Sequence, residues 1–360
     1  MNITLLGDIA FTGILSTESR KNHQRFEHIG PILHKSEMVF ANLEVPLKVD
    51  ESRNEYKSFI HYSLPKPTKN LLELLNIGCV SLANNHIYDC KMPGLKATID
   101  LLDEIGIHHT GAGWLQAHVQ PAIINKGEKK IAFLAYVDQN TNPKTEAFPE
   151  LLINYFNPEN VVRDIQNIKD KVDNVIVSIH WGVDYSSFYT NDQQQFARKI
   201  LQAGADIIMG HHSHTLQSFE IIDNKLVFYS LGQLCFGDIE WDNELRALKK
   251  KTKSGMIVEI TLTNDCCDYK LIPTIEKPQN YISISSVDIN KKLNKLGLIN
   301  EKISRHKSLA FVAHLKETIF DRLHEFFFGY YRNAFRQLID IKNFKKISYL
   351  IRDFKKFKSS

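Results

Sequence analysis

The residues best suited to chemistry in this chain are histidines, acids and asparagines that stand just after short apolar segments. Three of them, His211, His212 and His214, fall within four positions directly after the apolar run at residues 206–209. Packing alone accounts poorly for three neighbouring imidazoles, because each carries a polar tip that needs a partner. Imidazole nitrogens are good ligands for borderline divalent cations. The segment therefore predicts a metal-binding pair in His212 and His214.

Other polar groups follow further apolar runs in the same way. Each alone has an ordinary explanation: Asp8 can cap a helix, Glu44 can be a solvated loop acid, and residues 84–86 can form a polar turn. His180 can be a loop histidine beside a packed Trp181. Their joint occurrence favours a single site of nitrogen and oxygen ligands for Mn²⁺, Fe²⁺ or Zn²⁺. The groups in question are Asp8, Asn42, Glu44, Asn84, Asn85, His86, His180 and the three later histidines.

Short buried strands and amphipathic helices must position these groups. Strands are predicted at residues 3–6, 38–41, 80–83, 131–136, 175–179, 206–209, 226–229, 255–263 and 269–273. Helices are predicted at residues 68–75, 94–105, 159–169 and 193–204. Their alternation indicates a layered α/β fold. If neighbouring strands are parallel, their carboxyl ends share one edge, which is where open α/β sheets bind ligands. We therefore expect the polar groups to meet there.

Composition narrows the class of protein. Of 360 residues, 43% are hydrophobic and 24% are charged, as in ordinary globular proteins. The chain shows no basic leader and no apolar run of the roughly 20 residues that a membrane span needs. We expect a cytoplasmic protein without a signal peptide or transmembrane helix. Five cysteines without paired C-x-x-C spacing favour neither a disulfide framework nor a thiolate zinc site.

The last sixty residues differ from the rest in charge and aromatic content. Residues 301–360 carry 14 Lys and Arg against 6 Asp and Glu, and they hold 12 of the 37 aromatic residues. We expect a body at residues 1–275, a linker at 276–300 and a basic, aromatic-rich helical tail at 301–360. The favoured interpretation of the tail is a helical bundle packed on the body; the alternative is a basic amphipathic surface in peripheral contact with anionic lipid. No nucleic-acid partner is expected, because the body is net acidic and contains no nucleic-acid-binding motif.

Six motifs in order carry a resemblance to a known family. They are residues 7–8 (GD), 42–47 (NLEVPL), 83–89 (ANNHIYD), 180–185 (HWGVDY), 210–217 (GHHSHTLQ) and 229–233 (YSLGQ). Over residues 1–275 the chain resembles the CapA family of poly-γ-glutamate capsule biosynthesis proteins. That family is similar to the calcineurin-like metallophosphoesterases.

The resemblance implies a four-layered α/β/β/α sandwich with a two-metal centre. Asp8 and His214 would hold one metal, and Asn85, His180 and His212 the other, with Glu44 bridging them. His86 would be the general acid or the group that stabilises the transition state. Two metals polarise a phosphoryl oxygen and lower the pKa of a bound water. Residues expected to contact substrate or support the ligands are Asn42, Asn84, Asp89, Asp184, His211 and Gln233.

One departure from the phosphoesterase pattern bears on function. Metallophosphoesterases have a histidine two residues after the first Asp, and this chain has Ala10. One metal site therefore lacks a ligand or recruits His211.

Three hypotheses about the function follow. The first is a metal-dependent hydrolase of a phosphoester or related ester or amide in capsule or cell-envelope polysaccharide or poly-γ-glutamate metabolism. The second is a non-catalytic subunit of a capsule polymer synthesis or export complex with a structural metal site. The third is a γ-glutamyl or peptidoglycan amidohydrolase. Ala10 favours the second, and His86 favours the other two.

Overall fold

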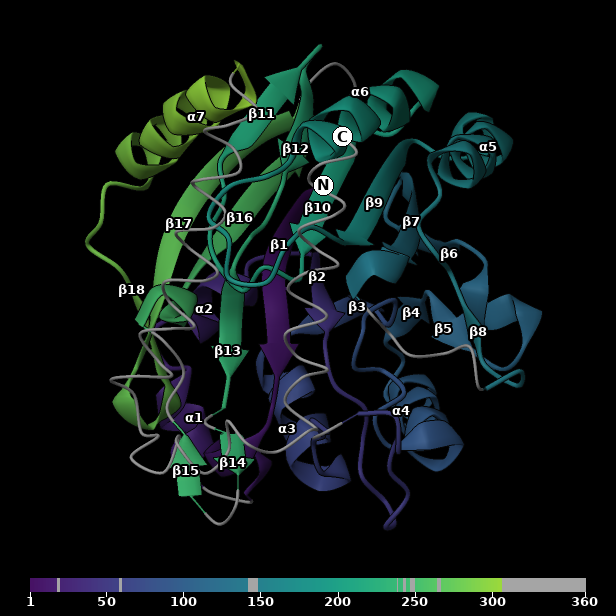
Figure 1. Cartoon of the computed structure of the whole chain (residues 1–360), viewed down its shortest axis with the longest axis vertical. Helices are drawn as coiled ribbons and strands as arrows, with labels where there is room; N and C mark the ends of the chain where they lie inside the picture. The colour runs from purple at the N-terminus through teal and green to yellow at the C-terminus, as the bar shows by residue number, and fades with distance from the viewer. Residues whose placement is uncertain are drawn as a thin grey trace, which may run out of the picture. The chain divides into compact units, whose positions relative to one another are not determined.

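Two β-sheets packed face to face form the centre of the fold (Figure 1). The computed structural model describes residues 1–305 apart from 18–19, 58–59, 142–147, 238, 242–243, 247–249 and 264–266. The chain divides into a compact unit at Met1–Gly297 and a second at Leu298–Ser360. The predicted tail lies outside the described residues from position 306 onward.

The first sheet combines a parallel half, which bears site residues, with an antiparallel half. Its strand order is β18-β17-β16-β1-β2-β3-β4, and β13 pairs with the end of β1. β1, β2, β3, β4 and β13 are parallel, whereas β16, β17 and β18 are antiparallel. The strands are β1 (Asn2–Ala10), β2 (Met38–Leu43), β3 (Ile77–Ser81), β4 (His108–Thr110), β13 (Gln233–Phe236), β16 (Ser254–Leu262), β17 (Cys267–Lys277) and β18 (Tyr281–Ile284).

The second sheet has the order β11-β12-β10-β9-β7-β6, with β12, β10, β9 and β7 parallel. Its strands are β6 (Ala122–Lys126), β7 (Lys129–Val137), β9 (Asn174–His180), β10 (Ile207–His211), β11 (Phe219–Ile222) and β12 (Lys225–Phe228). Two small ribbons pair β5 (Ala112–Gly113) with β8 (Leu152–Ile153), and β14 (Ile239–Trp241) with β15 (Glu244–Arg246).

Local sequence signals define the ends of the longer helices. α6 begins with a capping box, in which the Thr190 side chain accepts from the Gln193 backbone and the Gln193 side chain accepts from the Thr190 backbone. It ends at Gly204, whose φ of 126° favours a residue without a side chain. The helices are α1 (Lys21–Arg25), α2 (Gly30–Leu33), α3 (Pro65–Leu74), α4 (Lys91–Glu104), α5 (Pro158–Ile168), α6 (Asn191–Ala203) and α7 (Ile289–Arg305).

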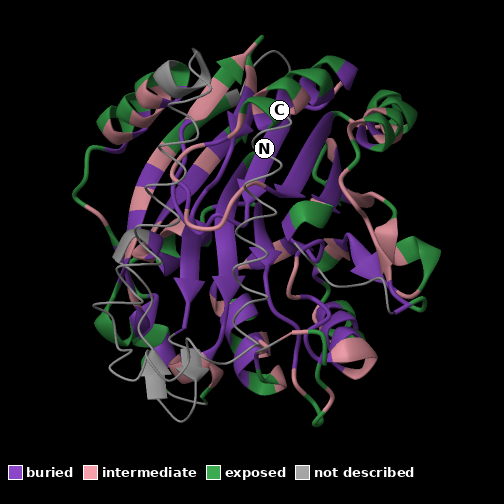
Figure 2. Ribbon diagram, in the orientation of Figure 1, coloured by how far each residue is buried: buried purple, intermediate pink, exposed green. Residues whose placement is uncertain are grey.

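Alternation along the strands divides the core into three apolar layers. In β2, Phe40 faces the second sheet, whereas Val39 and Ala41 face the outer helices. The outer face of the first sheet packs on α3 and α4, and that of the second sheet packs on α5 and α6. Figure 2 shows the buried strands of both sheets and the exposed outer surfaces of these helices. This arrangement is the expected four-layered α/β/β/α sandwich, and the fold prediction is confirmed.

The expected linker at 276–300 differs from what the structure shows. β17 continues to Lys277, and β18 pairs with it antiparallel. Ile289 and Leu293 of α7 are buried among residues of the inter-sheet core. Residues 276–297 thus belong to the first compact unit, because their apolar side chains complete its sheet and core. Among the described residues, none of the helices is long and apolar enough to cross a bilayer.

Candidate metal centre

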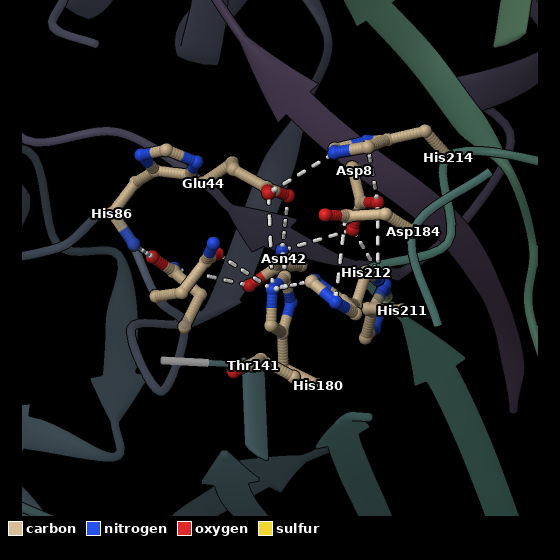
Figure 3. Close-up of polar contacts among 12 residues, drawn as sticks. Asp8, Asn42, Glu44, His86, Thr141, His180, Asp184, His211, His212 and His214 are labelled. Carbon is tan, nitrogen blue, oxygen red and sulfur yellow. Dashed lines mark hydrogen bonds and ion pairs between the residues drawn. The ribbon is translucent and has the colours of Figure 1, made fainter. Parts of the chain in front are cut away.

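The predicted site residues lie at the carboxyl ends of parallel strands, and these strands come from both sheets. Asp8 lies near the end of β1, and Glu44 directly follows β2. His180 ends β9, and His211 ends β10. The strand-end reasoning expected one shared edge; instead the edges of two facing sheets meet, because their apolar inner faces pack together. Figure 3 shows the side chains gathered from these separate elements.

Asp8, Glu44 and His180 form the centre of the cluster. Their ligand atoms all lie within 4.8 Å of one another, and all three residues are buried. Glu44 Oε1 lies 3.8 Å from His180 Nε2 and 3.7 Å from His214 Nε2. Within the described part of the chain this oxygen accepts no hydrogen bond. Burying a carboxylate oxygen without a partner is costly, and a coordinated cation removes that cost.

Asn85 and His212 complete one side of this cluster. His180 Nε2 lies 2.9 Å from Asn85 Oδ1 and 3.1 Å from His212 Nδ1. The structure thus brings together the amide oxygen, the two imidazoles and the Glu44 carboxylate that the resemblance assigned to one metal. On the outer side, His212 Nε2 lies 3.4 Å from Asp184 Oδ1, so Asp184 is placed to orient the ring.

Two histidines flank Asp8 on the other side. His211 Nδ1 lies 3.0 Å from Asp8 Oδ1, and His214 Nδ1 lies 3.4 Å from Asp8 Oδ2. Ala10 is fully buried in a small apolar cluster with Val45 and Phe236. The position where a metallophosphoesterase has a ligand histidine is therefore apolar here, while His211 supplies an imidazole next to the same aspartate.

Two asparagines hold the carboxylates in place. Asn42 Nδ2 donates to Asp8 Oδ1 and to Glu44 Oε2, both at 2.9 Å. Asn84 Nδ2 donates to Asn42 Oδ1 at 3.3 Å and to the Leu43 carbonyl at 2.8 Å. Both asparagines are fully buried, so they act as rigid supports beneath the cluster.

The carboxylates carry opposite pKa shifts. Burial raises the pKa of Glu44 well above its usual value, and the Asp8 charge raises it further. Burial also opposes ionisation of Asp8, but the adjacent His211 and His214 imidazoles outweigh it and hold the Asp8 pKa well below its usual value. Without a cation, Glu44 thus resists ionisation because it is buried and because Asp8 beside it is already charged.

The pKa values of the cluster histidines are shifted as well, downward for His180 and His212 and upward for His214. Burial, reinforced by neighbouring imidazoles, lowers the pKa of His180 well below its usual value and lowers that of His212. Burial also disfavours the charged form of His214, but its contact with Asp8 dominates and raises its pKa. His180 and His212 are therefore neutral at physiological pH, which is the form that binds a metal.

The loop after β10 stores backbone strain. His212 has φ of 89° and His214 has φ of 54°, a region that non-glycine residues occupy at a cost of about 1–3 kcal/mol each. Ser213, between them, donates from its hydroxyl to Ser230 Oγ at 2.9 Å and accepts from the Tyr185 amide through its carbonyl at 2.8 Å. This strain is typical of functional loops, because the surrounding contacts fix a geometry that the backbone alone disfavours.

His86 lies beside the cluster and is oriented by a carboxylate. Its Nδ1 is 2.7 Å from Asp89 Oδ2, and its backbone amide donates to Asn84 Oδ1 at 3.0 Å. Burial lowers the pKa of His86, and the Lys57 charge lowers it further. Burial alone would raise the pKa of Asp89, but Lys57 and His86 bring it down to about 2. The structure thus pairs His86 with Asp89, and both were among the residues expected at the site from the resemblance.

Sequence reasoning missed two residues of this unit. Lys57 Nζ donates to Asp89 Oδ1 and to the Asn85 carbonyl, and the His61 amide donates to Asp89 Oδ2 at 2.8 Å. The His61 ring lies edge-on to His86, with centroids 4.7 Å apart. Lys57 and His61 both come from the polar segment between Leu47 and Ser63, and a lysine in such a segment ordinarily indicates solvated surface. No spacing in the sequence could have identified them.

Gln233 lies in register with Asp8 on the paired strands β13 and β1, but its side chain has another partner. Its Nε2 donates to Glu276 Oε2 at 3.2 Å. The interactions of its amide thus involve β17, whereas the other predicted site residues contact one another. Of the five cysteines, Cys79, Cys90 and Cys235 are buried free thiols.

The chain is similar to known capsule-synthesis proteins. Residues 2–238 match the family model "Bacterial capsule synthesis protein PGA_cap". The chain is 31% identical over 249 residues to "Capsule biosynthesis protein CapA" of Bacillus anthracis, covering 67% of this chain and 58% of the relative. It is 28% identical to "PGA biosynthesis protein CapA" of Bacillus subtilis, covering 66% and 63%. The matches thus span about six tenths of the length of these relatives.

Solved structures similar to the chain include a 5'-nucleotidase precursor from Thermus thermophilus. That likeness has a TM-score of 0.46 and 14% identity and covers 84% of this chain and 59% of the other. A second, TT1561 of the same organism, has a TM-score of 0.39 and 8% identity and covers 75% and 97%. The match to the family model extends over more than half of the sequence and includes the residues of the metal cluster. The chain belongs to the bacterial capsule synthesis protein PGA_cap family.

Proposed function

We propose that this protein is a metal-dependent hydrolase that cleaves a phosphoester, or a related ester or amide, in the metabolism of capsule or cell-envelope polymers. One observation carries the proposal: a buried cluster of Asp8, Glu44 and His180 in which Glu44 Oε1 accepts no hydrogen bond from the described residues. The pathway is supported by the names of the relatives, which refer to capsule and poly-γ-glutamate biosynthesis.

The donor set fits one or two divalent ions such as Mn²⁺, Fe²⁺ or Zn²⁺. Asn85, His180 and His212 would hold one ion, Asp8 with His214 or His211 the other, and Glu44 would lie between them. Mixed imidazole and oxygen ligands without thiolates suit these borderline metals. When bound, such an ion supplies Lewis-acid polarisation of the scissile phosphoryl or carbonyl group.

The chain's own residues supply orientation and a proton. Asn42 and Asn84 fix the carboxylates, and Asp89 fixes the His86 ring through Nδ1. With Nδ1 paired to Asp89, a proton taken up at His86 Nε2 would convert the ring to imidazolium, and the lowered pKa of His86 would make that imidazolium a stronger acid toward the leaving group. A proton supplied in this way accelerates departure of an alkoxide or amine by about 10²–10⁴-fold.

The decisive experiment separates metal binding from turnover. Purified protein is assayed for bound metal, and then tested with Mn²⁺ against phosphomonoesters, phosphodiesters and γ-glutamyl amides. His86→Ala should abolish turnover and retain the metal, whereas Asp8→Asn should lose both. His28→Ala, at an exposed histidine, is the matched control and should change neither. Hydrolysis of the γ-glutamyl amides alone would identify an amidohydrolase.

The packing of Ala10 favours a second candidate, a non-catalytic subunit of a capsule polymer synthesis or export complex. Because Ala10 packs against Val45 and Phe236, the ligand histidine of metallophosphoesterases has no counterpart at this position. Such a subunit would bind metal stoichiometrically and lose stability without it. It would hydrolyse none of the substrates in the panel, and His86→Ala would leave its complex intact.

A further inference from the structure

Lys57 is a largely buried cation at the edge of the metal cluster, and the proposed chemistry gives it no role. Its side chain is 11% exposed, and its ammonium lies 2.5 Å from Oδ1 of the fully buried Asp89. The same ammonium donates to the Asn85 backbone carbonyl. Lysine is rarely buried, because removing an ammonium group from water is costly. The contacts of Lys57 therefore indicate what this cation stabilises.

Backbone hydrogen bonds fix the position from which Lys57 reaches the site. The Asn54 amide donates to the Asp89 carbonyl at 2.8 Å, and the Lys57 amide donates to the Asn54 carbonyl at 3.2 Å. The fully buried Asn54 also accepts from the Tyr56 amide at 3.1 Å through its side-chain oxygen, which closes the turn. Lys57 is thus anchored by its own backbone to the loop that its ammonium contacts.

This loop, between β3 and α4, presents the two side chains that the proposed function needs most. Asn85 Oδ1 lies 2.9 Å from His180 Nε2, in the group assigned to one metal. The next residue, His86, is oriented by Asp89 through its Nδ1 at 2.7 Å. Within the described part of the chain no backbone amide donates to the Asn85 carbonyl, and the Lys57 ammonium does. Lys57 therefore holds the peptide group that joins Asn85 to His86.

We propose that Lys57 is a positioning residue that sets both the metal ligand Asn85 and the proton donor His86. The inference rests on the proposed function, because that function assigns these two roles. A change in the tilt of the peptide group between the two residues moves both side chains at once. The ammonium fixes this tilt and also holds the Asp89 carboxylate that orients the His86 ring. One cation thereby couples the geometry of metal binding to that of proton donation.

Two other roles for Lys57 make different predictions. A lysine that only neutralises the buried Asp89 becomes dispensable once that carboxylate is replaced by a neutral amide. A lysine that binds the substrate directly raises KM when it is removed, whereas the loss of a positioning contact lowers kcat. Two of the three ammonium protons of Lys57 are directed at Asp89 and at the Asn85 carbonyl, which favours positioning.

Mn²⁺ binding to the EDTA-treated full chain, measured by calorimetry, tests the inference without turnover. The binding event that is lost in Asn85→Ala identifies the site concerned. Lys57→Met should weaken Mn²⁺ at this site by about 10- to 100-fold, the usual effect of removing a group that orients a ligand. The charge-balanced double variant Lys57→Met/Asp89→Asn should be equally weak. Asp89→Asn alone keeps the contact between Lys57 and the Asn85 carbonyl and should bind within about threefold of the wild type.

Lys91→Met is the matched control. Lys91 pairs with Glu55 of the same turn at 2.7 Å, but both side chains are substantially exposed, so the loss of this pair should leave Mn²⁺ binding unchanged. Circular dichroism of each variant establishes that it is folded. With saturating Mn²⁺ and a substrate that the wild type hydrolyses, Lys57→Met should lower kcat by about 10- to 100-fold and leave KM unchanged.

The inference is overturned if Lys57→Met binds Mn²⁺ as the wild type does, or if the double variant regains wild-type affinity. An increase in KM with an unchanged kcat would also overturn it, because Lys57 would then contact the substrate. Wild-type protein that binds Mn²⁺ but turns over no substrate would refute the hydrolase, and the Mn²⁺ affinities would still decide the role of Lys57. Turnover by the wild type with unchanged Mn²⁺ binding and kcat in Lys57→Met would refute only the positioning role.

Discussion

Glu276 is a buried carboxyl group of β17 away from the metal cluster, and replacing it with glutamine should stabilise the protein above pH 7. Its side chain is 3% exposed, and burial raises its pKa from 4.5 to about 7. Between these values the folded protein holds the proton more tightly than the unfolded chain does. The contribution of Glu276 to stability is therefore fully present below pH 4.5 and is lost as pH rises through about 7.

The size of this effect follows from the shift. Each pKa unit corresponds to about 1.4 kcal/mol, so ionised Glu276 costs the fold about 3 kcal/mol above pH 7. The glutamine side chain of the Glu276→Gln variant would remain neutral at every pH. Its amide would replace the carboxyl group in contacts with Gln233 Nε2, the Phe236 amide and Asn280 Nδ2. Asn280 Oδ1 has no hydrogen-bond partner among the described residues, so a rotated Asn280 amide can accept from the new NH₂ group.

Urea unfolding followed by tryptophan fluorescence, at pH values from 5 to 8.5, measures the difference. Glu276→Gln should match the wild type within about 1 kcal/mol at pH 5, and it should exceed the wild type by up to about 3 kcal/mol at pH 8. Glu128→Gln, at an exposed acid, should follow the wild type throughout. Identical pH dependence in the Glu276→Gln variant and the wild type would refute the reasoning, because the carboxyl group would then not be the source of the slope.

Three further predictions concern the site and the tail. Glu44→Gln should raise the melting temperature of EDTA-treated protein, because it removes a buried carboxyl group beside Asp8. Mn²⁺ should raise the melting temperature of the wild type but not that of the variant. Calorimetry that shows the same Mn²⁺ response in both would count against Glu44 as a ligand. Ala10→His should destabilise the metal-free protein by about 1–3 kcal/mol in urea unfolding, because the larger side chain must enter the packed cluster with Val45 and Phe236; an unchanged midpoint would show that the site has room for the missing ligand. If the basic tail contacts anionic lipid, removing residues 306–360, after α7, should reduce sedimentation with phosphatidylserine vesicles and leave the Mn²⁺ content unchanged. Equal sedimentation of the shortened and full-length proteins would end that interpretation.

Much of the architecture follows from local sequence. The predicted strand at 175–179 corresponds to β9 (Asn174–His180), and the predicted helix at 193–204 corresponds to α6 (Asn191–Ala203). Apolar runs of strand length and capping residues such as Thr190 act within a few residues, so the sequence displays them directly. Short strands such as β13 (Gln233–Phe236) and β18 (Tyr281–Ile284) were missed, because their identity depends on pairing with distant strands.

The sequence by itself determined which groups are available for the site. Asp8, Glu44 and His180 each follow an apolar run, and a strand delivers the residue after it to a sheet edge whatever the rest of the fold is. The tertiary structure alone decided that these edges belong to two facing sheets, since only inter-sheet packing brings β9 and β10 against β1 and β2. It also decided that Lys57 and His61 join Asp89, because the path of a polar segment is set by long-range contacts that no local pattern encodes.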